Sequence, residues 1–159
     1  MEIEHKFLVS SLFKHLATGV KHIVQGYLSD DPSRIVRIRV TDDKAFITIK
    51  GESTDDGLSR YEWEKQIGID EATQLLNLCL PGTIDKHRYI VPWKGHEWEV
   101  DEFHGALEGL TLAELEVPTA DTDFELPPFV GEEVTGNPRY YNSRLRKENC
   151  STPGRAANP

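Results

Sequence analysis

Hydrophobic and polar residues alternate along most of this chain. Eight segments show a period of two or are rich in β-branched and aromatic residues, which is typical of β-strands. They lie near residues 2–8, 21–28, 33–41, 44–51, 58–68, 84–92, 96–103 and 112–118. Short turn signals separate them, and short connections favour antiparallel neighbours. The pattern therefore predicts a mainly β fold in the α+β class with an antiparallel sheet.

Helical signals are few and short. An acidic first turn, an apolar stripe and a following Pro-Gly pair predict a helix over Asp70–Leu76. Weaker signals predict helices from Ser10 or Ser11 to Leu16, over Asp121–Glu125 and over Arg139–Lys147. The last residues are rich in Pro, Gly and Ala, so we expect one domain over 1–148 and a disordered tail over 149–159.

The charged residues gather on one face of each predicted strand, because residues two apart share a face. Acidic side chains dominate four strands and basic side chains three. The acidic residues are Glu2, Glu4, Glu62, Glu64, Glu99, Asp101, Glu114 and Glu116; the basic ones are Arg37, Arg39, Lys50, Lys86 and Arg88, and Lys6 and Arg60 share faces with glutamates. A single strand of this kind is best explained as half exposed to water. Solubilising charge would mix the signs, however, whereas here they segregate by strand.

Segregated charge predicts an unusual barrel. A barrel of eight strands is normally filled by apolar side chains, and burying unpaired charge is costly. A charged lumen must therefore be wet and hold ligand, metal and counter-charge. We expect an eight-stranded antiparallel β-barrel, or tunnel, with a charged interior. Its apolar outer faces need cover from the few helices or from a second subunit, which would make a homodimer.

Composition removes several classes of function. The formal net charge of −9 leaves no basic footprint for nucleic acid. A transmembrane β-barrel shares the inverted polarity, but the chain opens with charged residues rather than a signal peptide, and His5, Lys65 and His87 interrupt the apolar face. No apolar run is long enough for a membrane helix. The two cysteines form no ligand cluster, which favours a reducing, cytoplasmic compartment.

The ordered set of charged motifs resembles the CYTH superfamily, also called the triphosphate tunnel metalloenzymes. The family's Glu-x-Glu-x-Lys strand is present at residues 2–6, and Arg37-Ile38-Arg39, Glu62-Trp63-Glu64 and the later charged pairs follow in the family's order. The match covers about residues 1–147 and is closest to the bacterial inorganic triphosphatase-like members. It implies an enzyme that uses Mg²⁺ or Mn²⁺, as two ions, to hydrolyse a triphosphate to diphosphate and phosphate.

The resemblance assigns roles to the candidate residues. Arginine grips phosphate with two donors and lysine supplies a point charge, whereas Mg²⁺ and Mn²⁺ prefer carboxylate oxygens. The expected substrate ligands are Lys6, Arg37, Arg39, Lys50, Arg60, Lys86, Arg88 and Arg139. The expected metal ligands are Glu2, Glu4, Glu62, Glu64, Glu99, Asp101, Glu114 and Glu116. Eight carboxylates stand against six cations when Arg60 and Arg139 are left out of the count, which gives a charge of −2, so the metal-free tunnel should repel triphosphate.

The catalytic groups are less determined. Lys86 and Tyr27 are the expected catalytic residues: a water attacks the terminal phosphorus, and Tyr27 either orients it or merely packs in the tunnel wall. No pocket for a base is legible, so inorganic triphosphate is the expected substrate. A class IV-type adenylate cyclase, a thiamine triphosphatase and a non-catalytic module that binds triphosphate or polyphosphate remain the alternatives.

Overall fold

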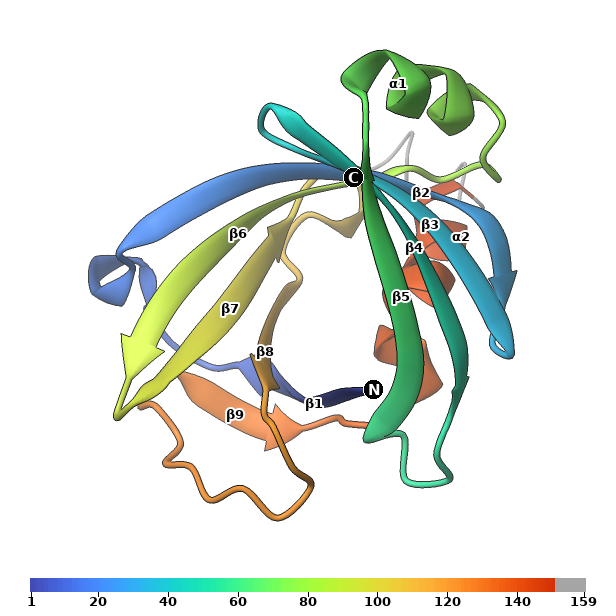
Figure 1. The fold of residues 1–159 in the computed structure, drawn as a ribbon. Helices are drawn as coiled ribbons and strands as arrows, with labels where there is room; N and C mark the ends of the chain where they lie inside the picture. The colour runs from blue at the N-terminus through green and yellow to red at the C-terminus, as the bar shows by residue number, and fades with distance from the viewer. Residues whose placement is uncertain (151–159) are drawn as a thin grey trace.

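A computed structural model describes residues 1–150 as a closed barrel of eight antiparallel strands with a ninth strand added at one edge (Figure 1). The strands follow the order β5-β4-β3-β2-β6-β7-β8-β1, and β1 returns to β5 to close the barrel. Their bounds are β1 Glu2–Val9, β2 Gly19–Asp31, β3 Arg34–Thr41, β4 Lys44–Ser53, β5 Ser59–Ile67, β6 Ile84–Trp93, β7 His96–Phe103, β8 Thr111–Glu116 and β9 Val130–Glu133. The predicted eight-stranded antiparallel barrel is therefore confirmed.

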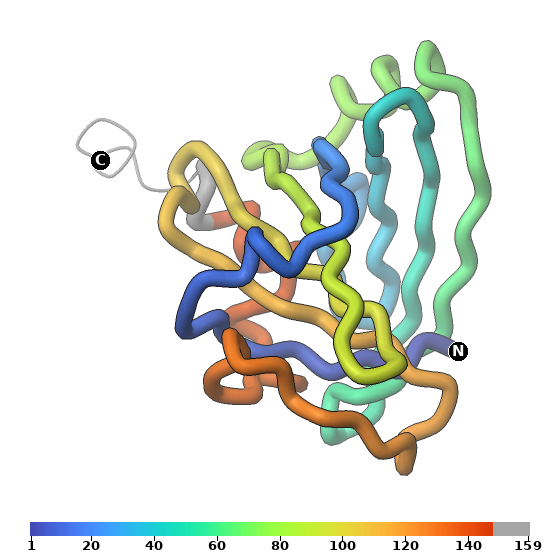
Figure 2. The backbone as a smooth tube through the Cα atoms, turned by 90° about the vertical axis from the view of Figure 1, so that its left-hand side faces the viewer, coloured from blue at the N-terminus to red at the C-terminus, as the bar shows by residue number. Residues whose placement is uncertain are grey.

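Strand β1 closes the barrel because its first residues pair on the edge opposite to β8. Glu4 to Leu8 pair with β8, while Glu2 pairs with Arg60 and Ile3 with Ser59 of β5. The end of β1 pairs instead with β9, which the sequence pattern did not predict. Figure 2 shows the N-terminus lying beside the start of β5. The first charged strand is thus a neighbour of both β5 and β8.

The largest hydrophobic cluster lies outside the barrel. Phe7, Trp98, Val100 and Leu115 alternate with charged residues that point inward, and they pack against residues of the segments before β2 and after β8. The segment after β8 is not the helix predicted over Asp121–Glu125; that prediction was wrong. Phe124 packs instead against Phe7 and Trp98, with ring centroids 6.4 and 5.9 Å apart. An irregular chain can cover the apolar face by inserting one aromatic ring.

Helical elements complete the cover. The predicted helix near residue 70 is confirmed as α1 Ile69–Asn77, whose Ala72 packs on Ile38 and Ala45 of the outer barrel wall. The helix predicted to end at Leu16 is only a 3₁₀ turn, η1 Lys14–Leu16. Two further 3₁₀ turns are η2 Gly105–Leu107 and η3 Pro138–Tyr140.

Helix α2 Asn142–Cys150 closes one end of the barrel. Its Leu145 is buried with Ile84, Phe103 and Leu112, which lie on the same inward faces as the charged pairs of β6, β7 and β8. Arg146 fixes the helix, donating to the carbonyl of Pro81 at 3.0 Å and to the Asp30 carboxylate. The lumen is therefore a pocket with an apolar floor. The helix runs past the predicted domain boundary at 148, and the predicted tail from 151 onward lies outside the described residues.

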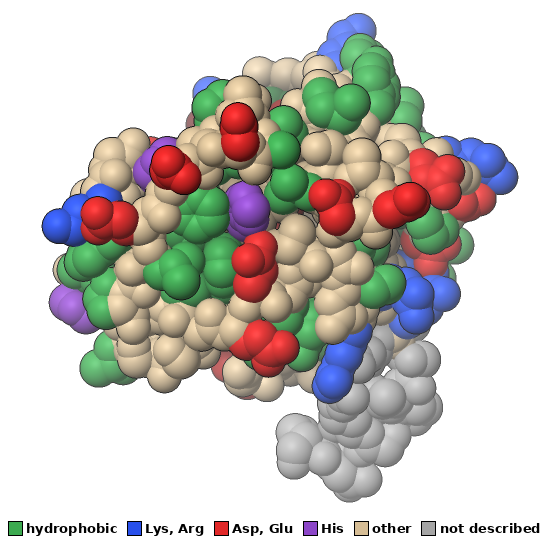
Figure 3. Space-filling view, turned by 90° about the horizontal axis from the view of Figure 1, so that it is seen from below, with side chains coloured by type: hydrophobic (Ala, Val, Ile, Leu, Met, Phe, Trp, Pro, Cys, Tyr) green, Lys and Arg blue, Asp and Glu red, His purple; other side chains and the backbone are tan. Residues whose placement is uncertain are grey.

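Seen from below, acidic side chains are spread over the face of the molecule and basic ones lie mostly at its edge (Figure 3). This distribution matches the net charge of −9. Among the described residues, no helix has the length and hydropathy that crossing a membrane requires.

Candidate functional site

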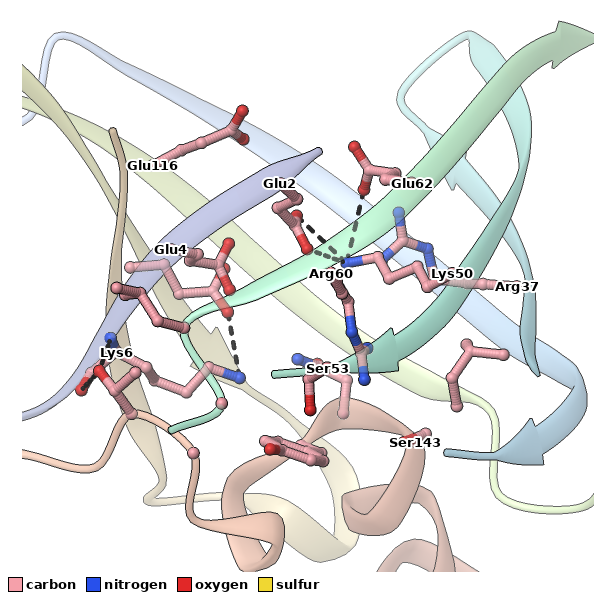
Figure 4. A pocket seen from close by; sticks show the side chains of 18 of the residues that line it. Glu2, Glu4, Lys6, Arg37, Lys50, Ser53, Arg60, Glu62, Glu116 and Ser143 are labelled. Carbon is pink, nitrogen blue, oxygen red and sulfur yellow. Dashed lines mark hydrogen bonds and ion pairs between the residues drawn. The ribbon is translucent and has the colours of Figure 1, made fainter. Parts of the chain in front are cut away.

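The barrel encloses a cavity of about 290 Å³ that is lined mainly by charged side chains. Figure 4 shows Glu2, Glu4 and Lys6 of β1 facing Lys50 of β4 and Arg60 of β5. The charged residues that line the cavity are Glu2, Glu4, Lys6, Arg37, Arg39, Lys50, Arg60, Glu62, Glu64, Arg88, Glu99, Glu114 and Glu116. Thirteen of the predicted site residues therefore converge on one space, together with Tyr27.

Some of these charges neutralise one another. The ammonium of Lys50 lies 3.0 Å from a Glu2 oxygen and 3.5 Å from Glu62, as the dashed lines in Figure 4 show. Burial alone would raise the pKa of Glu2, but Lys50 lowers it. Lys6 donates to the carbonyl of Tyr140 and lies 3.2 Å from Glu114. Burial opposes the charge on Glu114 too, yet Lys6 and Arg88 lower its pKa to about 2.

A second charged group lies at the closed end of the barrel. Asp101 accepts two hydrogen bonds from Arg88, at 2.7 and 2.8 Å, and one from Lys86 at 2.7 Å. Lys86 is fully buried and also donates to the side chain of Asn142 on α2. Burial lowers the pKa of Lys86 to about 7, with repulsion from Arg88 and Arg39 adding to the effect and Asp101 opposing it. Lys86 and Asp101 lie behind the cavity wall rather than on its surface.

Three arginines that line the cavity have donors without a partner among the described residues. Arg39 donates to Gln25 at 2.8 Å and forms no ion pair within the described chain. Burial lowers the pKa of Arg39 to about 9, and the positive charges of Arg37 and Arg88 lower it further. The Nε of Arg37 is buried with no hydrogen-bond partner in that same part of the chain. Arg60 stacks over the ring of Tyr141 at 5.8 Å from its centroid. The guanidinium groups of Arg39 and Arg60 therefore have donors available to an anion, whereas the Nε of Arg37 is closed off from the cavity.

Two carboxylates are likewise left without a cation. Glu4 and Glu116 are cross-strand partners on β1 and β8, and neither forms an ion pair or a hydrogen bond through its side chain in residues 1–147. Burial raises the pKa of Glu4 to about 8, and the charges of Glu114 and Glu2 contribute. Burial also raises the pKa of Glu116, together with the charges of Glu2 and Glu62. Carboxylates that resist ionisation in the same space suit a divalent cation.

The described residues contain no preassembled group of three or more acidic, histidine or cysteine ligands. What fits a metal ion is therefore the donor set itself: the carboxylates of the cavity outnumber its cations, and two of them, Glu4 and Glu116, are unpaired. Glu2 lies on the same strand as Glu4, and Glu62 on the adjoining β5. Mg²⁺ and Mn²⁺ prefer such oxygen donors. The predicted metal ligands Glu64 and Glu99 also line the cavity, but each lies within 4 Å of an arginine, Arg37 and Arg88 respectively.

Tyr27 is 2% exposed and lines the cavity, as its place on the inward face of β2 predicts. Its hydroxyl accepts a hydrogen bond from the Gln25 amide at 3.0 Å, and Gln25 in turn accepts one from Arg39. Because Gln25 supplies that hydrogen, the hydroxyl proton of Tyr27 is free to point at an occupant of the cavity.

The structure differs from the sequence predictions at the edges of the site. Arg139 lies outside the tunnel, where it is exposed and lines a separate pocket beside Leu107 and Tyr140. The sequence pattern also missed several lining residues that the β4–β5 turn and the C-terminal segment contribute: Ser53, Gly57, Leu58, Thr135, Gly136, Tyr141, Asn142 and Ser143. No local signal marks them, since most lie in turns or in the segment before α2, where no alternation shows which side chains face the barrel interior.

The fold and cavity define a tunnel protein whose lumen presents both unpaired arginines and unpaired carboxylates. The chain belongs to the CYTH domain family, whose family model matches residues 1–149, so the predicted resemblance is confirmed. It is 48% identical over 148 residues to an inorganic triphosphatase of Acetivibrio thermocellus, covering 92% of this chain and 93% of the relative. It is 38% identical to an inorganic triphosphatase of Nitrosomonas europaea, covering 91% and 95%.

Solved structures agree with these relatives. The crystal structure of the inorganic triphosphatase NE1496 superposes with a TM-score of 0.65 at 32% identity, covering 91% of this chain and 96% of that one.

Proposed function

We propose that this protein is an inorganic triphosphatase that depends on Mg²⁺ or Mn²⁺. One observation carries the proposal: a single cavity holds arginines without a carboxylate partner and carboxylates without a cation. Arg39 and Arg60 offer donors to phosphate oxygens, whereas Glu4 and Glu116 offer oxygens to a metal. A ligand that is itself a polyanion bound to cations satisfies both sets at once.

The chain's own residues would bind and orient the substrate. Arg37 and Arg39 of β3 grip phosphate oxygens, and Arg60 and Lys50 extend the grip to the neighbouring strands. Binding relieves the repulsion among the arginines that lowers the pKa of Arg39. Phosphoryl transfer depends mainly on such positioning and charge stabilisation, so no covalent nucleophile is required.

Glu4 and Glu116, with Glu2 and Glu62 beside them, are the residues proposed to hold the metal, as two ions. A divalent cation there neutralises phosphate charge and lowers the pKa of water. Tyr27 would donate its free hydroxyl proton to a phosphate oxygen or to the attacking water and so orient it. Lys86 acts in this proposal as a positioning residue, because it holds Asp101 and Asn142 behind the wall.

The test is phosphate release by purified protein from inorganic triphosphate, ATP, thiamine triphosphate and pyrophosphate. We expect inorganic triphosphate to have the highest kcat/KM, pyrophosphate to be poor, and chelation to abolish turnover until Mg²⁺ or Mn²⁺ is restored. Full activity in excess chelator would overturn the metal requirement. Conversion of ATP to cyclic AMP and pyrophosphate would indicate the cyclase, and tight binding without turnover the non-catalytic module.

We further propose a homodimer in the cytoplasm. The outer face of β4 and β5 leaves Ile49, Tyr61 and Trp63 between 36% and 58% exposed, and Ile49 and Trp63 are register partners. Burying this apolar face against a second copy would remove it from water. Light scattering over a range of concentrations tests the assembly, with Trp63→Glu expected to yield monomers. A wild-type protein that stays monomeric at all concentrations contradicts the dimer. The cytoplasmic location is a separate proposal, which cell fractionation tests.

A further inference from the structure

Three histidines form a row on the outside of the barrel, away from the charged cavity. His22 of β2 and His87 of β6 are register partners whose rings stack with centroids 4.8 Å apart. His104 directly follows β7, and its Nε2 lies 2.6 Å from Nδ1 of His87. Since Lys86 and Arg88 point into the barrel, His87 between them points outward. The row therefore belongs to no part of the triphosphate site.

Carboxylates flank both ends of this row. Nε2 of His22 lies 2.8 Å from an oxygen of Asp85, and Nδ1 of His104 lies 4.0 Å from an oxygen of Glu108. The backbone N–H of His104 also donates to the carbonyl of Asp85, which fixes the turn after β7 against β6. The side chains of His22 and His104 are 47% and 30% exposed, so solvent and ions can reach the row.

The contact between His87 and His104 has the chemistry of a metal site. Two ring nitrogens at hydrogen-bond distance share a single proton, so two lone pairs converge on one point. Zinc binds imidazole nitrogen at about 2.0–2.1 Å, which places two nitrogens of a tetrahedral site roughly 3.3 Å apart. Replacing the shared proton by the ion therefore requires the rings to separate by less than about 1 Å.

Glu108 supports the same interpretation. A histidine that binds a metal usually donates its other ring N–H to a carboxylate, which fixes the ring and makes it a better ligand. If Nε2 of His104 binds the ion, Nδ1 is the nitrogen that faces Glu108. The carboxylate is 73% exposed and has no other ion pair within the described residues, so it is free to complete this contact.

We propose that His87 Nδ1 and His104 Nε2 form a binding site for a divalent transition-metal ion of the Zn²⁺ type, oriented by Glu108. In the part of the chain that the structure describes, no three ligands are already assembled. Water completes the coordination when the ion binds. Imidazole suits Zn²⁺, whereas Mg²⁺ and Mn²⁺ prefer the oxygen ligands of the tunnel. The two sites therefore select different ions.

The experiment follows the histidine ring nitrogens by NMR in the full chain, with Mg²⁺ in excess and Zn²⁺ added stepwise. We expect the ring signals of His87 and His104 to shift with the added Zn²⁺ while those of the exposed His15 stay in place. His104→Gln should abolish the shift of His87, and the matched control His15→Gln should leave it unchanged. Glu108→Gln should weaken the apparent Zn²⁺ affinity about tenfold.

Each contrary outcome overturns the proposal. Unshifted His87 and His104 signals at a large molar excess of Zn²⁺ would exclude the site. Equal shifts in wild type and in folded His104→Gln would show that the ion is bound elsewhere. Because Glu108 is exposed, Glu108→Gln is expected to fold even if His104→Gln does not. An unchanged affinity in that variant would remove the assigned role of Glu108 and of the nitrogen facing it.

Discussion

At the residue scale, the charged side chains of the cavity fall into two groups with different consequences. Lys50, Glu2 and Glu114 are held in ion pairs within the protein, so their charge is already compensated. Arg39 and Glu4 are not compensated, and their pKa values move in the directions that oppose their charged forms. Uncompensated groups gain most from a ligand, and they are the sharpest places to test the proposed function.

Arg39→Ala should lower kcat/KM for inorganic triphosphate by about 10²–10³-fold, because one preorganised donor for developing phosphate charge is lost. Arg34→Ala on the same strand is the matched control, since Arg34 is exposed and lies outside the cavity. Steady-state kinetics at saturating Mg²⁺ provides the measurement. Equal efficiency in the Arg39 variant and the wild type would place this arginine outside the reaction.

Glu4→Gln should stabilise the metal-free protein in alkaline solution. The pKa of Glu4 is raised from 4.5 to about 8, so the folded state keeps a proton that the unfolded state releases. The contribution of Glu4 to the free energy of unfolding is thus fully present below about pH 4.5 and is lost as the pH rises through about 8. Thermal unfolding in chelator should show a higher Tm for the variant at pH 9 and no difference near pH 4.

The control for that measurement is Glu97→Gln, which replaces an exposed carboxylate of β7 and should leave the pH dependence unchanged. In the presence of limiting Mg²⁺, Glu4→Gln should instead raise the metal concentration needed for half-maximal activity. A wild-type Tm profile together with wild-type metal use would show that Glu4 is not in the metal site.

At the element scale, the β4–β5 turn is joined to the segment that leads into α2 by two glycines in contact. Gly57 and Gly136 both adopt positive φ, at 73° and 78°. A Cβ added to Gly57 would lie 2.2 Å from Cα of Gly136, a separation that no side chain tolerates. Tyr141 and Arg60, which line the cavity, lie beside this contact. The glycines thus help to seat the C-terminal segment against the barrel.

Gly57→Ala and Gly95→Ala form a matched pair that isolates this contact. Both glycines have positive φ, but a Cβ on Gly95 meets nothing within 4 Å. Gly95→Ala should cost about 1–2 kcal/mol of unfolding free energy, the backbone penalty alone. Gly57→Ala should cost clearly more and also raise KM for triphosphate. Urea unfolding and kinetics measure both; equal losses in the two variants would mean that the contact contributes nothing.

A second element-scale prediction concerns the attachment of α2. Arg146 is 8% exposed and joins the helix to Asp30 and to Pro81. Arg146→Ala should lower the free energy of unfolding by about 1.5–3 kcal/mol, the range for hydrogen bonds to a charged group. Arg144→Ala, an exposed position on the same helix, is the control and should change stability by less than about 0.5 kcal/mol. Similar values for both variants would contradict the anchoring role.

At the scale of the whole molecule, the charge balance makes triphosphate binding depend on metal. Six cationic and seven acidic side chains line the cavity, and the chain as a whole carries a formal net charge of −9. Calorimetry with a non-hydrolysable triphosphate analogue should therefore show binding at least tenfold weaker in chelator than in Mg²⁺, a difference of about 1.4 kcal/mol. Equal affinities under the two conditions would show that the arginines alone suffice.

The periodicity of the sequence determined most of the architecture. Alternation fixes which side chains of a strand share a face, and the segregation of charge signs by strand then favoured a barrel with a charged lumen. It also identified most of the cavity residues, because strands such as β3 and β5 carry two or more of them at spacings of two. These are local properties of each strand, and they do not depend on contacts with distant segments of the chain.

Tertiary structure alone decided the rest. β9 is only four residues long, and it forms because the end of β1 has a free edge with which it can pair. The segment before β9 covers the hydrophobic core by packing Phe124 against it and does not form a helix. Lys50 pairs with Glu2, 48 positions away, and Lys86 lies behind the wall because α2 closes the barrel there. Which charges are compensated and which stay available to a ligand depends on such distant contacts, and no local pattern of residues encodes them.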